Sequence, residues 1–493
     1  MKALKTITIK GWLLAISLLF CIVAQGQSIR YSNFYDSNLG AELLKEGVLL
    51  DDGSMLIIGN TSESNGSCCG RSLNIVVDEE GLLEHQFVRE AVDTNIIPNG
   101  VLITEEGYIF EAGHICDFSV PSHGYCDFYL AKLDQTGDTL FTKVYERPDT
   151  ADIMLDIVQT RPNKLLLIGW TYNDTISGNA DLMFLTVDTL GNELNRVVWG
   201  GAGTDYVHSG LTVDSLGSVI MVGYTGSFPS LNNGRSWVVK TDSVGNVQWY
   251  RTYSGIGAAT ANGIRATKLA DGNVIISGGK SGDGYLQKID TAGNEIWIQL
   301  YNVPEAQGLW DVKELADGSF VSCGVTIGND NSQAGWLIKT DEDGDTLWTR
   351  TYNLSSLIDF IRFMLVMPNG DIVMLGNGRS PGEVNQDGWI LRVDSMGCVV
   401  EGCFSVGINE EQKEVGLSVY PNPVADVLRV RFADKSVLSL VAITISDMLG
   451  REVLRFKAKS NTALDVSTLK SGLYMVRTKS ENGVSSSAKF VKE

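Results

Sequence analysis

The sequence has few of the side chains on which many catalytic and metal sites depend. Its 493 residues include four histidines and eight cysteines. No C-x-x-C pair and no cysteine–histidine spacing typical of a zinc site occurs, and the GxSxG, HExxH and phosphate-binding loop signatures are also missing. Carboxylates, in contrast, are too numerous for their spacing to single out a glycosidase pair. The sequence therefore predicts no metal, no cofactor and no identifiable catalytic residue.

Positive charge and proline are scarce as well. Lysine and arginine together number 39 against 59 aspartates and glutamates, so the net charge is −20. This balance argues against nucleic acid as a partner, because nothing supplies an attractive field for phosphates. Ten prolines against 53 glycines are typical of a turn-rich β protein rather than a disordered one.

Long apolar runs are missing except near the N-terminus. Three lysines precede an apolar run over 12–24, and small residues follow at 24–26. This pattern predicts a cleaved signal peptide over 1–26, because the run is too short for a comfortable membrane span. A lipoprotein signal would use Cys21, but the bulky Phe20 precedes that residue and the apolar run continues past it. We therefore expect export, after which disulfides are permitted.

Two disulfides are predicted from the spacing of the cysteines. Cys116 and Cys126 bracket a short polar excursion, and Cys398 and Cys403 bracket the four residues "VVEG". Cys323 lies in the apolar run "FVSCG", where a buried free thiol is the simplest interpretation. The sequence leaves the pairing of the remaining residues open: Cys68, Cys69 and Cys323.

One short phrase recurs throughout the first 400 residues. It has the form Asp-x-x-Gly, and seven copies start 48 to 56 residues apart. The copies lie at 78–81, 134–137, 188–191, 242–245, 290–293, 341–344 and 394–397. A period of this size indicates an array or a propeller. The phrase predicts a tight hairpin turn in which the aspartate bonds the backbone ahead and the glycine adopts a positive φ.

The other landmarks of the repeat predict four short strands per unit. An apolar strand leads to a two-residue turn, and a β-branched strand follows that ends in glycine. These glycines are Gly59, Gly113, Gly169, Gly223, Gly278, Gly324 and Gly376. The fourth strand carries large side chains four residues apart, as at Trp249 and Tyr253, and we expect these pairs to pack between neighbouring units.

A count of these strands predicts how the repeat ends. Six turns are followed by a convincing fourth strand, but the seventh is followed by "CVVEGCF", which lacks the aromatic pair. The segment 28–35 has Tyr31 and Tyr35 at the same spacing and precedes the first unit. We therefore predict an all-β fold in which 27–404 form a seven-bladed β-propeller closed by this N-terminal strand. A linear solenoid is the alternative.

The units resemble the loosely defined propeller repeats of secreted bacterial proteins, which share D-x-x-G-N-x-x-W turns. After a polar linker over 405–416, the sequence changes character, and 417–493 alternate between strands and turns, which predicts a small β-sandwich. This segment resembles the type A C-terminal sorting domain of the type IX secretion system of Bacteroidetes-type bacteria. The motifs that carry the resemblance are "YPNP", "ISDMLGREV", "LDVSTLKSGLYMVR" and a basic end. Their characteristic residues are Tyr420, Pro421, Asn422, Pro423, Gly450, Leu464, Asp465, Leu469, Gly472, Tyr474, Lys489 and Lys492.

The resemblance implies the type IX secretion machinery as a partner and a secreted or outer-surface location. For the propeller itself, we predict binding of an extracellular protein or glycan through the variable connections on one face, because recognition usually lies on loops held by a rigid scaffold. The candidate aromatic residues are Trp170, Tyr172, Tyr206, Tyr224, Phe228 and Trp310. Two alternatives remain: a secreted hydrolase of a polymer, with its site in the propeller mouth, and a structural component of the envelope.

Overall fold

All secondary structure in the computed structural model consists of β-strands in the part of the chain that the structure describes. That part comprises residues 30–35, 40–63, 70–90, 94–117, 125–148, 150–172, 179–228, 235–253, 261–280, 282–301, 306–327, 332–352, 359–379, 385–399, 417–421, 423–432, 441–447, 451–459, 462–479 and 485–492. The chain divides into two compact units, 1–403 and 404–493. The predicted signal peptide and linker lie outside the described residues.

The first unit contains seven four-stranded antiparallel sheets among its described residues. The first is β2 (Gly40–Leu49), β3 (Met55–Glu63), β4 (Gly70–Val77) and β5 (Leu83–Arg89). The second is β6 (Thr94–Ile103), β7 (Ile109–Asp117), β8 (Tyr125–Leu133) and β9 (Thr139–Tyr145). The third is β10 (Ala151–Arg161), β11 (Lys164–Tyr172), β12 (Ala180–Val187) and β13 (Glu193–Trp199). The fourth is β14 (Asp205–Thr212), β15 (Val219–Thr225), β16 (Arg235–Thr241) and β17 (Val247–Thr252).

The remaining three sheets follow the same pattern. The fifth is β18 (Ala261–Lys268), β19 (Val274–Lys280), β20 (Asp283–Ile289) and β21 (Glu295–Tyr301). The sixth is β22 (Ala306–Glu314), β23 (Phe320–Ile327), β24 (Gln333–Thr340) and β25 (Thr346–Tyr352). The seventh is β26 (Phe360–Val366), β27 (Ile372–Gly378), β28 (Asp387–Val393) and β1 (Tyr31–Tyr35), which pairs with β28.

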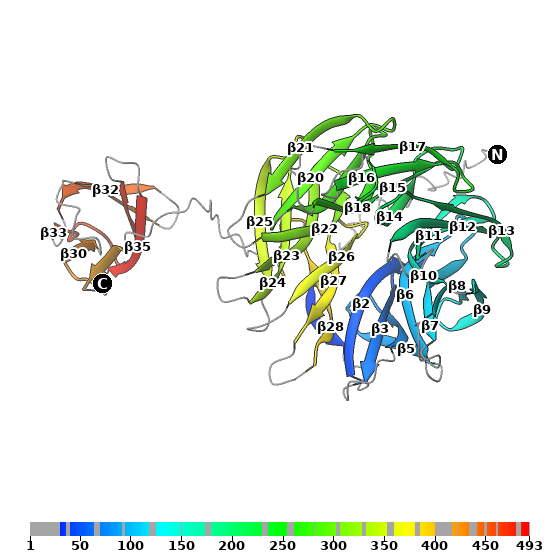
Figure 1. The fold of residues 1–493 in the computed structure, drawn as a ribbon. Helices are drawn as coiled ribbons and strands as arrows, with labels where there is room; N and C mark the ends of the chain where they lie inside the picture. The colour runs from blue at the N-terminus through cyan, green and yellow to red at the C-terminus, as the bar shows by residue number, and fades with distance from the viewer. Residues whose placement is uncertain are drawn as a thin grey trace, which may run out of the picture. The chain divides into compact units, whose positions relative to one another are not determined.

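The sheets surround a common centre. Their first strands, called the inner strands here, contact one another in the order β2, β6, β10, β14, β18, β22, β26 and back to β2. Figure 1 shows the consequence for the chain ends: the yellow strands β26 to β28 lie beside the blue strand β2. Four-stranded sheets arranged in this way form a β-propeller, so the predicted fold type is confirmed.

Each sheet has two different ends. The registers place the short turns between first and second strands, and between third and fourth strands, at one end, called the turn side. The connections between second and third strands and the links between sheets lie at the other end, called the loop side.

The recurring Asp-x-x-Gly turns have the predicted chemistry. The Asp134 carboxylate accepts the backbone N–H groups of Thr136 and Asp138, at 2.9 and 3.0 Å. Five other copies repeat both bonds, and Asp78 accepts the backbone N–H of Leu82. The turn glycines have positive φ in all seven copies, from 75° to 90°. The turns also join neighbouring sheets, because tyrosine hydroxyls of the preceding sheet donate to the glycine carbonyl oxygens. Such bonds link Tyr35 to Gly81, Tyr145 to Gly191, Tyr253 to Gly293, Tyr301 to Gly344 and Tyr352 to Gly397.

The glycines of the second strands have a different role from the predicted one. They do not end these strands: β11, for example, continues past Gly169 to Tyr172. Each glycine instead pairs with the inner-strand residue just before a β-bulge, as Gly169 pairs with Met154. A Cβ at Gly169 would collide with the Ile153 carbonyl oxygen and would lie 2.7 Å from the Phe128 ring. The glycine therefore leaves room for the bulge.

We predict that replacing the turn glycine Gly293 by alanine destabilises the protein more than the same change at Gly272. Both glycines have positive φ, 81° and 87°, so both variants carry a backbone cost of roughly 1–2 kcal/mol. A Cβ at Gly293 would also lie 2.7 Å from the Trp249 ring, whereas at Gly272 no atom lies within 4 Å. Displacing the ring should add roughly 1–3 kcal/mol. Denaturant unfolding of both variants measures the difference, and equal losses would contradict this role for Trp249.

The second unit contains two sheets over one apolar core. One has the order β29 (Leu417–Tyr420), β30 (Val427–Phe432) and β33 (Thr462–Asp465). The other has the order β32 (Glu452–Ala458), β31 (Val441–Asp447), β34 (Gly472–Lys479) and β35 (Ser485–Lys492). The core includes Leu464, Val476 and Phe490.

The motif residues of this unit divide between core and surface. Leu464 and Tyr474 are buried, Leu469 packs against the core, and the Tyr474 ring stacks on Phe490. Lys492, at the basic end, is also buried. The exposed members are Tyr420, Pro421, Pro423, Asp465, Gly472 and Lys489. Asn422 and Gly450 lie outside the described residues. No helix long and apolar enough to cross a membrane occurs in the described ranges.

Candidate binding site at the centre of the propeller

The bulges of the inner strands determine which side chains meet at the centre. Each bulge inserts one residue, and these residues are Lys45, Asn99, Leu155, His208, Ile264, Trp310 and Arg362. The residue after each bulge starts a second layer, nearer the turn side. The region between the inner strands is called the central channel here.

The second layer holds a cluster of charges. Glu46 on β2 forms an ion pair with Arg265 on β18, with Oε1 and Nη1 2.9 Å apart, although 219 residues separate them in the sequence. Lys313 and Asp311, both on β22, form another pair at 3.0 Å. Asp156 on β10 is buried close enough to Arg265 for the two charges to interact. The channel is thus crossed by alternating charges from four inner strands.

The three acids also join neighbouring inner strands. Asp156 accepts the backbone N–H of Gly210 on the next inner strand at 2.8 Å. Asp311 accepts that of Met364 at 3.0 Å, and Glu46 accepts that of Val101 at 3.3 Å. Ser209 occupies the equivalent position on β14 and accepts the N–H of Ala266 at 3.2 Å. These bonds satisfy backbone donors that would otherwise be buried without a partner.

Burial controls the protonation of this cluster. It raises the pKa of Glu46 to about 7, because Asp156 adds to the effect and Arg265 opposes it only in part. Burial likewise raises the pKa of Asp156. For Arg265, burial alone would lower the pKa, but the carboxylates of Glu46, Asp311 and Asp156 together raise it above its usual value. The guanidinium therefore stays charged, whereas Glu46 changes its charge near neutral pH.

We predict that Glu46 makes the stability of the protein pH-dependent. The native pKa of about 7 exceeds the unfolded value, so protonation stabilises the native state at low pH and this stabilisation is lost as the pH rises through 7. Between about pH 4.5 and 7.5, wild type should lose roughly 3 kcal/mol relative to Glu46→Gln. Urea unfolding of both proteins across this range measures the difference. Burial also lowers the pKa of His114 and His208, but both residues are present in the two proteins, so their contributions cancel in the comparison. Parallel pH profiles would contradict the assignment of the pH dependence to Glu46.

A cavity of about 420 Å³ lies in the channel on the turn side of this cluster. Arg265, Glu46 and Lys313 contribute polar groups to its lining, and the remaining walls are apolar, with Val48, Leu102, Phe363 and Leu365 among them. Every carboxylate oxygen of Glu46 and Asp311 already accepts a hydrogen bond from the protein. These acids therefore hold the inner strands in place rather than face the cavity with a free oxygen.

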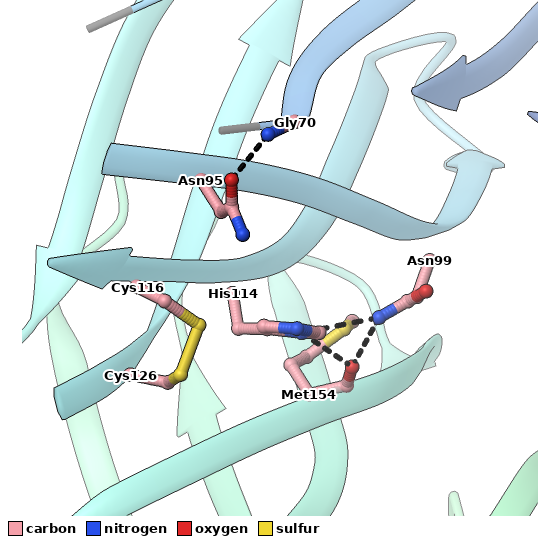
Figure 2. Close-up of a disulfide and its surroundings, with 7 residues drawn as sticks. All are labelled: Gly70, Asn95, Asn99, His114, Cys116, Cys126 and Met154. Carbon is pink, nitrogen blue, oxygen red and sulfur yellow. Dashed lines mark hydrogen bonds between the residues drawn. A yellow bond between two sulfur atoms is a disulfide. The ribbon is translucent and has the colours of Figure 1, made fainter. Parts of the chain in front are cut away.

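The loop side of the same cluster is different. The Lys45 ammonium donates to Asn99 Oδ1 at 2.6 Å, and Asn99 Nδ2 donates to the Met154 carbonyl oxygen at 2.6 Å. His114 lies beside this group, with Nδ1 3.2 Å from Asn99 Nδ2 (Figure 2). Burial and the charge of Arg362 lower the pKa of Lys45 to about 7. Burial and Lys45 lower the pKa of His114 to about 4, so this imidazole is neutral at pH 7.

Arg362 occupies the bulge of β26 and is exposed. Its guanidinium lies 4.8 Å from the ring centres of both Trp310 and Phe360, which are themselves 5.6 Å apart. Burial of part of the side chain lowers the pKa of Arg362. Lys45 and Arg362 therefore place two cations at the loop side of the channel, next to aromatic rings.

The predicted aromatic residues lie in four groups. Five of them belong to strands rather than loops. Trp170 and Tyr172 on β11 and Tyr224 on β15 do so because the second strands continue past their glycines. Tyr206 and Trp310 lie instead on the inner strands β14 and β22, which begin at Asp205 and Ala306. All six candidates are half-buried. Trp170 contacts Tyr172 at 5.0 Å, and Tyr206 stacks on Tyr224 at 5.2 Å. Phe228 stacks on Trp199 at 5.2 Å, while Trp310 joins Arg362.

The predicted Cys116–Cys126 disulfide is confirmed (Figure 2). It joins the loop-side ends of β7 and β8 and closes the segment between them. Cys398 is disulfide-bonded, and Cys403, its predicted partner, lies outside the described residues. Cys68 and Cys69 lie outside them too. Cys323 is buried as a free thiol.

Sequence reasoning missed Lys45, Glu46, Arg265 and Arg362. The sequence contains one weak signal for these positions. Most bulged residues lie eight positions before the residue with positive φ in the following turn, as Lys45 does before Gly53, and the second-layer residue comes next. Nothing in a single repeat shows that this position faces its six counterparts. His85 pairs with Asp138 at 3.0 Å and takes no part in the channel. The described residues contain no group of three or more histidine, cysteine or acidic side chains arranged to hold a metal ion.

Comparison with known proteins supplies two findings. Among solved structures, the chain is similar to a protein of unknown function from Dyadobacter fermentans, with 9% identity and a TM-score of 0.45 over 74% of this chain and 97% of that one. It is similar to a Penicillium chrysogenum α-L-arabinanase complexed with arabinobiose, with 14% identity and a TM-score of 0.41 over 64% and 97%. It is also similar to NanB in complex with optactamide, with 11% identity and a TM-score of 0.41 over 74% and 68%. At these values the likenesses say nothing about activity.

The search among curated proteins found no match. The second finding concerns the second unit, where the family model of the secretion system C-terminal sorting domain matches residues 418–493. The match covers the two sheets β29 to β35 and the motif residues named above. The chain therefore carries, at 418–493, a C-terminal sorting domain of the type IX secretion system.

Proposed function

We propose that this protein is exported by a signal peptide at 1–26, carried across the outer membrane through its sorting domain, and displayed outside the cell as a binding protein. Its binding part is a closed ring of seven blades over 27–404, and its ligand is a protein or a glycan. A linker over 405–416 joins the ring to a sorting domain with a β-sandwich fold over 417–493. The pairing of β1 with β28 and the cyclic contacts of the inner strands support the closed ring.

The observation that carries the binding role is the difference between the charged second layer of the channel and the loop side of the propeller. The acids of the second layer accept backbone N–H groups and cations, and these bonds hold the ring together. The loop side presents the half-buried aromatic residues and the two cations instead. Aromatic side chains give a large contact area at low entropic cost, which suits recognition.

A hydrolase is the second candidate, and one observation favours it. Glu46 lines the turn-side cavity and has a pKa raised to about 7, as general acids often have. Against this role, Glu46 Oε1 and Oε2 accept from Arg265 and from the Val101 backbone, so a substrate would have to displace one of these partners.

We expect the mature protein to bind one class of extracellular protein or glycan on an array. The triple variant Trp170→Ala, Tyr172→Ala and Tyr224→Ala should lose affinity by roughly thirtyfold, because loss of a central aromatic contact costs about 2 kcal/mol. Tyr108→Ala is the matched control, since Tyr108 is an exposed aromatic residue near a turn-side turn. The melting temperatures should stay close to that of wild type. Binding that the triple variant retains, or glycan cleavage that Glu46→Gln abolishes, would contradict the proposal.

A further inference from the structure

The two loop-side cations differ from their neighbours in the second layer in one respect. Arg265 and Lys313 each have a carboxylate within 3.0 Å. Lys45 and Arg362 have no acidic partner in the part of the chain that the structure describes, and the only charge acting on the pKa of Lys45 is that of Arg362. Two like charges held near each other without a counter-ion oppose folding. Two cations without an acidic partner are expected where a bound anion supplies the compensating negative charge.

Both cations are held in position before any ligand arrives. Asn99 accepts from the Lys45 ammonium at 2.6 Å and is itself anchored to the Met154 carbonyl oxygen. Arg362 lies over Trp310 and Phe360, which fix the plane of its guanidinium. Arg362 is exposed, so a ligand can reach its side chain, whereas Lys45 is half-buried. A planar guanidinium with a fixed orientation suits a carboxylate, which it can bind through two parallel hydrogen bonds.

The charge of the whole protein narrows the choice of anion. At a net charge of −20, the protein repels a polymer that carries a charge on every unit. A ligand polymer that is neutral apart from a single carboxylate is repelled much less, and this carboxylate can still bind both cations. The half-buried ring of Trp310, beside Arg362, offers apolar surface to the C–H groups of a sugar ring, and the buried Phe360 ring supports it from 5.6 Å.

We propose that Lys45 and Arg362 bind the carboxylate of an acidic sugar at the end, or at isolated positions, of a mostly neutral glycan. This inference rests on the proposed binding function and names its ligand class. The carboxylate enters from the loop side, between β2 and β26, and neutralises the two cations, while the sugar ring packs against Trp310 on β22.

The test uses the full mature chain and calorimetric titration at pH 6.5. Glucuronic acid and its methyl glycoside are the acidic probes, and glucose is the neutral control. Lys45→Met and Arg362→Met should each lower the affinity for glucuronate by about tenfold or more, because each removes one charge-assisted contact. Lys45→Arg should retain binding. The matched control is Lys132→Met, since Lys132 also lies over aromatic rings, 3.4 Å from the Tyr108 ring centre, but outside the channel.

The melting temperature separates this role from a structural one. Removing an uncompensated cation should leave the melting temperature unchanged or raise it, whereas a structural lysine or arginine would lower it on removal. Equal affinity for glucuronate and glucose, or binding that both variants retain, would overturn the acidic-sugar site while leaving a glycan-binding function in place. Preference for a peptide with a free C-terminal carboxylate over glucuronate would overturn the sugar class. Absence of any protein or glycan ligand on the arrays would overturn the proposed function together with this inference.

Discussion

Deletion of residues 28–35 should destabilise the first unit by more than about 5 kcal/mol and remove its cooperative unfolding transition. This segment contains β1, which pairs with β28 from Tyr31 to Tyr35. Without it, β28 becomes an open edge, and the buried Tyr31 ring leaves the core between the first and seventh sheets. The hydroxyl of Tyr35 and the amide of Asn33 also lose their bonds to the Gly81 carbonyl oxygen in the first sheet.

Circular dichroism during thermal unfolding measures this loss. Removal of 486–493 is the matched control: it deletes eight residues from the other end of the chain, within the sorting domain, and should leave the transition of the first unit unchanged. Tyr35→Phe, which removes only the hydroxyl, should cost about 1 kcal/mol. If the two truncated proteins melt alike, β1 does not close the ring.

Replacing Arg265 by methionine should cost roughly 3–5 kcal/mol of stability at pH 8, because it leaves Glu46 buried without its partner. Asp156 and Asp311 would also lose the cation that acts on all three carboxylates. At this pH, Glu46 is above its pKa of about 7 and carries its charge. The loss should shrink at pH 5, where protonation of Glu46 removes part of the repulsion.

A double-mutant cycle measures the coupling directly. Adding Glu46→Gln to Arg265→Met should restore more than half of the lost stability, because the unpaired charge is gone. Arg161→Met is the control, since Arg161 is an exposed arginine whose guanidinium bonds a backbone carbonyl oxygen near the turns, and its loss should cost about 0.5 kcal/mol. Additive losses for the two changes would show that Glu46 and Arg265 do not form a coupled pair.

Local chemistry made much of the fold predictable. An Asp-x-x-Gly turn depends on an aspartate that bonds its own backbone and a glycine with positive φ, and both requirements are visible in six consecutive residues such as 290–295. The spacing of Tyr31 and Tyr35 matched that of the other fourth strands, so β1 was recognisable from residues far from its partner β28. The sorting domain was recognisable for the same reason, since its motifs are short and contiguous.

The role of the second-strand glycines could not be predicted from one unit. In the sequence, Gly169 looks like the end of a strand, because glycine has low strand propensity. In the structure, the strand continues past the glycine, which pairs with the residue just before a bulge. The carbonyl oxygen of Ile153 there occupies the space that a Cβ would need. Whether a residue faces a bulge depends on the partner strand and its register, and the sequence of one strand contains neither. The same error placed Trp170, Tyr172 and Tyr224 in loops.

The repeat, its turns, its four-stranded unit and the nature of the C-terminal domain could be predicted from the sequence alone, because each of these depends on residues close together in the chain. The content of the channel depends on tertiary contacts. Glu46 meets Arg265 across 219 residues, and Lys45 and Arg362 lie on inner strands at opposite ends of the propeller sequence. Seven positions, one per unit, face a common centre once the sheets surround it, and their charges act on one another only there. A pattern that recurs once in about fifty residues, with a different side chain each time, has no local signature, so the candidate site became visible only in three dimensions.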